Sequence, residues 1–185
     1  MKTNFHPTLT IATALVVALC ATNVRAAETD NAALRIGIYD SRAVAFAWFW
    51  SAAHQNQLNE QMRAARAAKA AGDTNRFNEL GTTLREQQDR IHREGFSTAP
   101  PTEALAELKV RLPEIQRAAG VSVLVSKWDE GSLRQFKGAQ QVDVTDQLVR
   151  EFNPTEKSLK TISELEKSKP LPLDQCNELI RKGEI

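Results

Sequence analysis

Cysteine, aromatic residues, net charge and long hydrophobic runs are all scarce in this chain of 185 residues. Two cysteines are too few for the disulfide framework of a small secreted scaffold or for a four-thiolate zinc site. A formal net charge of +1 lacks the basic excess with which proteins bind nucleic acid. The apolar run at residues 9–21 is shorter than the ~20 residues that cross a bilayer. What remains is a domain of moderate size that is held together by packing.

The first residues have the pattern of an export signal. Lys2 precedes the apolar run, and Val24-Arg25-Ala26 places small residues where a signal peptidase cuts. We expect residues 1–26 to be a signal peptide and the protein to be exported. Two alternatives are a retained membrane anchor and a lipoprotein modified at Cys20, and the second is disfavoured by the bulky Leu19. Cleavage would leave Cys176 as the one remaining cysteine.

Two short segments have the alternation of strands. Residues 34–40 alternate apolar and other side chains, and residues 121–125 are β-branched or aliphatic apart from one serine. A third short strand is expected at residues 133–136. Between the first two lies a long helical stretch, so the sequence predicts an α+β, helix-rich protein with a small β-sheet.

A helical hairpin is expected at residues 42–94. Residues 42–71 contain no proline or glycine, and Gly72-Asp73-Thr74 can end one helix and cap the next. The returning segment carries apolar residues every seventh position, as in a coiled coil: Phe77, Leu84 and Ile91. The sequence therefore predicts a protruding α-helical arm with a packed root and a solvated tip.

A third helix is predicted at residues 102–119, after the break expected at residues 95–101. Its apolar stripe includes Leu108 and Ile115, and Gly120 would end it. Pro113 should kink or break it. We expect the stripe to pack against the aromatic cluster that begins at Trp48.

The sequence offers no constellation of residues typical of catalysis, cofactor binding or metal binding. His54 and His92 have no second His or Cys at ligand spacing, so both are expected on exposed helical faces. Motifs such as G-x-S-x-G, C-x-x-C and a phosphate-binding loop are not found. We therefore expect a protein that is not an enzyme and has no cofactor.

The order of these segments resembles the OmpH-like (Skp) family of periplasmic chaperones. The resemblance rests on the strand Arg-Ile-Gly-Ile-Tyr-Asp at residues 35–40, the helical hairpin, the Val-Ser-Val-Leu-Val strand at residues 121–125, and Asp-Val-Thr at residues 143–145 before an apolar-faced helix. It covers residues 33–153, within a domain expected at 27–153. It implies a location in the periplasm, a homotrimer that completes the sheet, and a holdase that binds unfolded outer-membrane or envelope proteins without ATP.

The arm would supply the client-binding surface, with a thin apolar seam bordered by arginines. The residues expected to contact clients are Leu58, Met62, Arg63, Arg66, Phe77, Leu80, Leu84, Arg85 and Ile91. The alternative function is a non-enzymatic envelope adaptor or structural protein that bridges partners through the same hairpin. Residues 154–185 form an extension, interpreted either as a loosely docked appendage or as a partner-binding segment with Cys176 as an intermolecular thiol.

Overall fold

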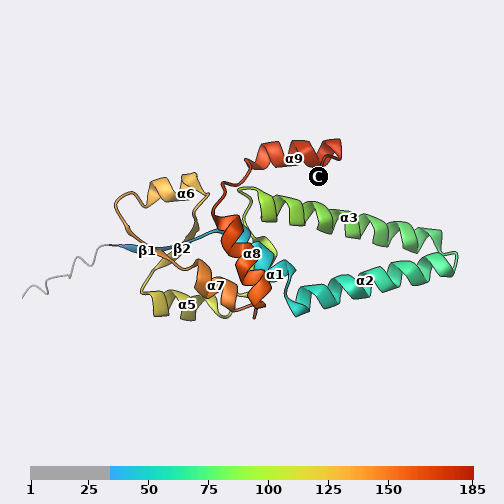
Figure 1. Cartoon of the computed structure of the whole chain (residues 1–185), viewed down its shortest axis with the longest axis horizontal. Coiled ribbons are helices and arrows are strands. Elements are labelled where there is room, and N and C mark those ends of the chain that lie inside the picture. Colours follow the sequence, from blue (N-terminus) through green and yellow to red (C-terminus); the bar gives the residue numbers. More distant parts are fainter. Residues whose placement is uncertain (1–33) are drawn as a thin grey trace, which may run out of the picture. The chain divides into compact units, whose positions relative to one another are not determined.

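The computed structural model describes residues 34–185, and the expected signal peptide with Cys20 lies outside them. The described residues form three strands and nine helices (Figure 1). In chain order these are β1 (Arg35–Tyr39), α1 (Ser41–Phe49), α2 (Ala52–Ala70), α3 (Thr74–Phe96), α4 (Thr102–Glu107), α5 (Leu112–Ala119), β2 (Val123–Ser126), α6 (Glu130–Gln135), β3 (Gln140–Asp143), α7 (Thr145–Arg150), α8 (Glu156–Glu166) and α9 (Leu173–Lys182). The α+β, helix-rich class is confirmed.

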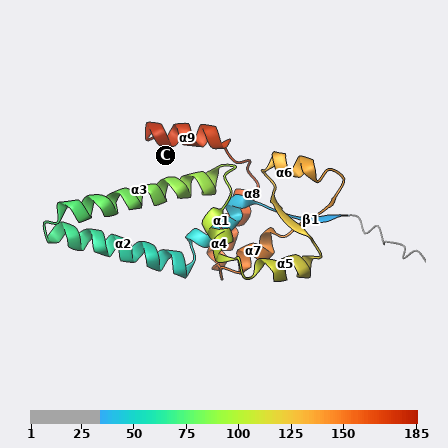
Figure 2. The ribbon, with the colours of Figure 1, turned by 180° about the vertical axis from the view of Figure 1, so that it is seen from behind.

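The sheet has three parallel strands in the order β2-β1-β3. Ile36 of β1 pairs with Val123 on one side and with Gln141 on the other. Parallel neighbouring strands need a crossover connection. The connection from β1 to β2 and the connection from β2 to β3 run in opposite directions across the sheet, so right-handed crossovers place their helices on opposite faces of the sheet. Accordingly α6 lies on one side of the sheet and α5 on the other (Figures 1 and 2).

The strand predicted at residues 133–136 is wrong. This segment belongs to α6 and the turn after it, and the third strand is β3. The side chain of Asp129 accepts a hydrogen bond from the backbone N–H of Ser132 at 3.0 Å, which caps α6. Gly138, at a φ of 90°, then turns the chain into β3.

The helix expected at residues 42–71 is divided into α1 and α2. Ser51 caps α2 by accepting a hydrogen bond from the backbone N–H of His54 at 3.2 Å. The side chain of His54 is 4% exposed, and the rings of Trp48 and Phe49 each lie 5.3 Å from its ring. The expectation of an exposed His54 is therefore wrong, because the change of direction at Ser51 folds the imidazole back onto α1.

Helices α2 and α3 are connected by a tight turn and lie side by side (Figures 1 and 2). Gly72 has a φ of 73°, and Asp73 caps α3 by accepting the N–H of Arg76 at 3.0 Å, as predicted. The break expected at residues 95–101 comes later than Gly95, since α3 continues to Phe96. Gly95 is a contact position: a Cβ there would lie 2.9 Å from the ring of Phe46.

The helix predicted at residues 102–119 is interrupted before its proline. α4 and α5 are separate, and Pro113 lies in the first turn of α5, where its missing N–H has no intrahelical partner to lose. Gly120 ends α5 at a φ of 64°, as predicted. Leu108 and Ile115 are buried in one core with Trp48, which confirms the expected packing.

Residues 154–185 are not a loosely docked appendage. Ile162 of α8 is 4% exposed and belongs to the main core. Leu171 forms an isolated parallel bridge with Ser97, and α9 then packs on α3. Cys176 is fully buried there, so its thiol is not placed for contact with another protein.

Candidate functional sites

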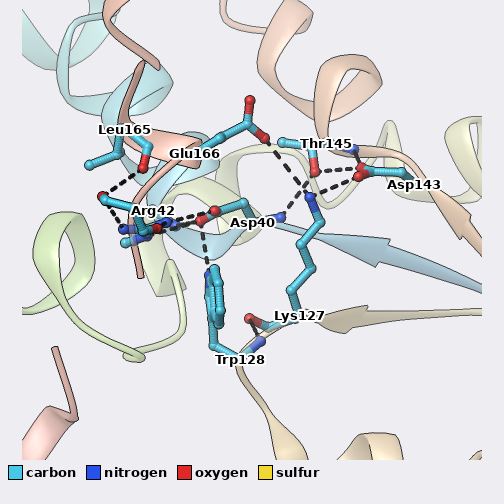
Figure 3. Close-up of polar contacts among 10 residues, drawn as sticks. Asp40, Arg42, Lys127, Trp128, Asp143, Thr145, Leu165 and Glu166 are labelled. Atoms are coloured by element: carbon cyan, nitrogen blue, oxygen red, sulfur yellow. Dashed lines mark hydrogen bonds and ion pairs between the residues drawn. The ribbon is translucent and has the colours of Figure 1, made fainter. Parts of the chain in front are cut away.

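A network of polar side chains lies where the three strands end (Figure 3). Asp40 follows β1, Lys127 follows β2 and Asp143 ends β3. Because the strands are parallel, their carboxyl ends share one edge of the sheet, which is where ligands bind in many open α/β sheets. The edge was not predicted, because the sequence was searched for single strands and not for the residues at their carboxyl ends. The signal that could have identified it is an acidic or basic residue at the carboxyl end of each strand.

Asp40 and Arg42 form a buried ion pair at this edge. Each side chain is at most 2% exposed, and the Arg42 Nη2 lies 2.9 Å from the Asp40 Oδ2. The Asp40 Oδ1 also accepts hydrogen bonds from the Arg42 Nε at 3.2 Å and the Trp128 Nε1 at 3.0 Å. The Arg42 Nη2 donates to the backbone oxygen of Ser168 at 2.8 Å, which connects the pair to the end of α8.

A second part of the network surrounds Lys127. Its Nζ lies 2.7 Å from the Asp143 Oδ2 and 3.9 Å from the Glu166 Oε1. The Thr145 hydroxyl donates to the Asp143 Oδ1 at 2.6 Å and accepts the backbone N–H of Asp40 at 3.0 Å. All three strands are thereby connected to α7 and α8.

The electrostatic environment of the two acids differs. Burial acts to raise the pKa of Asp143, but the hydrogen bonds from Lys127 and Thr145 together lower it below its ordinary value. Burial raises the pKa of Glu166, and the charge of Lys127 only partly opposes this effect. The Lys127 contact with Asp143 is therefore the stronger of its two ion pairs.

The side chains of this network bind one another and connect the sheet to the helices around it. The Asp40 carboxylate accepts bonds from three side-chain donors in addition to its cap of α1, so it is not free to act as a nucleophile or base. Among residues 34–185, no cluster of three or more His, Cys, Asp or Glu side chains could hold a metal ion. A pocket of about 670 Å³ lies beside Lys127 and Trp128, and its walls carry both acidic and basic side chains.

The structure divides the residues predicted to contact clients into inner and outer groups. Leu80 is 7% exposed between α2 and α3, and Ile91 packs against the main core. Leu58 and Leu84 are half-buried. The outer group consists of Met62, Phe77, Arg63, Arg66 and Arg85, all of them exposed.

A second buried group lies near the base of the helix pair. Glu94 is 5% exposed, and burial raises its pKa to about 7. His54 shifts in the opposite sense, because burial and the charge of Arg90 lower its pKa. Arg90 itself forms an ion pair with Glu103, which connects α3 to α4. None of these contacts was predicted from the sequence.

Comparison with known proteins adds no relative. No protein-family model, no curated protein and no solved structure matches the chain. In the part of the chain that the structure describes, no helix is both long and apolar enough to cross a membrane.

Proposed function

We propose that this protein is a periplasmic holdase, which binds unfolded outer-membrane or envelope proteins without ATP through α2 and α3. The observation that carries the proposal is the exposure of Met62 and Phe77, at 37% and 36%. Of the helix pair, only the base, at Ile91, packs against the main core of residues 34–185. The resemblance of residues 33–153 to the OmpH-like (Skp) chaperones supports the same function.

The distal part of the helix pair is suited to transient binding. The buried apolar side chains between its two helices are few: Ala65, Ala68 and Leu80. Met62 and Phe77 remain available for apolar contact, and nearby exposed arginines can interact with acidic or aromatic groups of a client. A few scattered apolar side chains give weak, unselective contacts without a large patch that would cause self-association.

The base of the pair is anchored, which suits a protruding arm. Phe96 makes an edge contact with Phe46 of α1, and Cys176 of α9 lies against the backbone of His92. The turn between α2 and α3 lies at the end farthest from the sheet in both views (Figures 1 and 2). A client can then engage the tip without disturbing the core.

A homotrimer is proposed because the sheet is small. Within residues 34–185, β2 and β3 each have β1 as their one strand neighbour, so each has an unpaired edge. Pairing with neighbouring chains would cover these edges. Sedimentation velocity at micromolar concentration tests this proposal, and a cooperatively folded monomer would contradict it.

The holdase activity is tested by light scattering from a urea-unfolded outer-membrane protein diluted into buffer. The mature protein at stoichiometric ratio should suppress aggregation without ATP, and Met62→Ser/Phe77→Ser should lose most of this protection. Val110→Ser is the matched control, because Val110 is an 88% exposed apolar residue outside the helix pair. The double variant Arg63→Gln/Arg66→Gln tests the arginines of α2 in the same assay. Its control is Arg117→Gln/Arg150→Gln, at two arginines outside the helix pair, and all four side chains are exposed.

Two results would contradict the proposal. Equal protection by the Met62/Phe77 variant and the wild type would show that the outer group is not the binding surface. Failure of the intact protein to protect several unrelated clients would remove the holdase function. An adaptor that bridges envelope components through the same helices would then be the better account.

A further inference from the structure

A second pocket, of about 490 Å³, lies away from the tip of the helix pair. The ends of α3 and α8 form two of its sides. Its apolar wall consists of Phe96, Leu165, Leu171 and Ile185. Phe96 and Ile185 are 42% and 41% exposed, so this wall is open to a ligand. The volume is in the range of small-molecule sites, ~300–1,000 Å³.

The ionisable side chains around this pocket are all basic. Arg42, His92 and Lys169 line it, and no carboxylate side chain is among the lining residues. The pocket beside Lys127 differs, since it is lined by Glu130 and Asp174 as well as by lysines. An apolar wall with basic groups on one side matches a ligand that has an apolar tail and a negative head.

Arg42 contributes to this pocket a guanidinium that is already paired with Asp40. Its side chain is 2% exposed, and the paired Asp40 fixes the guanidinium through Nε and Nη2. The Nη1 has a weaker partner: the Ser168 Oγ lies 3.4 Å away and already donates to the backbone oxygen of Leu165 at 2.9 Å. The Nη1 carries two hydrogens in the fixed plane of the guanidinium, so the second can be offered to a ligand oxygen while the pair with Asp40 stays in place.

We propose that this pocket binds an aliphatic carboxylate such as a medium-chain fatty acid. The tail would lie against Phe96, Leu171 and Ile185, and the carboxylate would face Arg42 and Lys169. The proposal is independent of client binding by α2 and α3. It assigns a ligand to the junction of α3, α8 and the residues that flank α9.

The experiment is calorimetric titration of the whole mature protein with decanoate. Decanol has the same tail without the charge, and decylammonium has the opposite charge. Decanoate should bind at least about tenfold more tightly than either. Lys169→Gln should weaken decanoate binding about two- to fivefold, as expected for one exposed charge. Lys160→Gln, an exposed lysine of α8 that does not line the pocket, should leave binding unchanged.

Removal of the apolar wall gives an independent test. Phe96→Ala should weaken binding severalfold, whereas Val110→Ala should have no effect. If Phe96→Ala is unfolded by circular dichroism, Ile185→Ser removes part of the same wall at an exposed position. Equal binding of decanol and decanoate, no binding of decanoate, or binding unchanged by both Lys169→Gln and the wall variant would overturn the proposal. Met62→Ser/Phe77→Ser should bind decanoate normally, which separates this pocket from the proposed holdase surface.

Discussion

Glu94 is a buried carboxyl group whose protonation should control stability near neutral pH. Burial raises its pKa from 4.5 to about 7 in the folded protein. A raised pKa stabilises the fold below the unfolded value, and that stabilisation is lost as the pH rises through about 7. Glu94→Gln should therefore gain about 2 kcal/mol of unfolding free energy relative to wild type between about pH 5 and pH 8.

Urea unfolding at several pH values measures this difference. Glu86→Gln is the control, since Glu86 is an exposed residue of the same helix. His54 titrates in the opposite direction, because its lowered pKa removes stability as the pH falls below its ordinary value of 6.5. If the difference in unfolding free energy between Glu94→Gln and wild type stays constant across this pH range, the predicted raised pKa of Glu94 is wrong.

Arg42 and Asp40 give a second prediction at the residue scale. Arg42→Ala leaves the 1% exposed Asp40 without its cation, so it should cost about 3–5 kcal/mol of unfolding free energy. Asp40→Asn/Arg42→Met, which removes both charges, should be less destabilised than Arg42→Ala alone. Chemical denaturation of wild type and the two variants measures both costs. A cost below about 1 kcal/mol for Arg42→Ala would show that the pair does not fasten α1 to α8.

At the scale of elements, local signals were predicted from the sequence more successfully than long-range contacts. Alternation of apolar and other side chains identified β1. Gly72 and Gly120 both have a positive φ at a helix end, and a glycine at such a position is visible in the local sequence. Residues 133–136 were assigned to a strand, but a segment of four residues with Leu133 and Phe136 at its ends is too short to distinguish a strand from a helix. The structure has a helix there, which is capped by Asp129. The burial of His54 and the polar edge of the sheet depend on contacts between distant segments, which periodicity does not contain.

Two glycines of α3 make the distinction between local and tertiary effects measurable. A Cβ at Gly95 would lie 2.9 Å from the Phe46 ring, whereas a Cβ at Gly81 would meet nothing within 4 Å. Gly95→Ala should therefore destabilise the protein by about 1–3 kcal/mol through overpacking. Gly81→Ala should stabilise it by about 0.5–1 kcal/mol, because alanine has the higher helix propensity. Thermal unfolding of both variants checks the opposite signs, and stabilisation by both would mean that α1 and α3 do not pack at Gly95.

At the scale of the whole molecule, the proposal gives two parts different roles: the body forms the trimer, and the helix pair α2 and α3 binds clients. The body contains the sheet, the main core and residues 154–185, which pack on it through Ile162 and Leu171. The proposed trimer edges belong to β2 and β3, and Met62 and Phe77 lie in α2 and α3. Assembly and client binding should therefore be separable by mutation.

Shortening the helix pair tests this separation. Replacement of residues 59–87 by a short glycine-rich turn removes the outer group but retains Ile91, the Arg90–Glu103 ion pair and the contact of Gly95 with Phe46. The shortened protein should sediment as the same oligomer as wild type and bind decanoate with the same affinity, yet give no protection against client aggregation. A shortened protein that assembles and still protects clients would place the binding surface on the body. A shortened protein that folds but sediments as a monomer would show that α2 and α3, rather than the sheet edges, hold the subunits together.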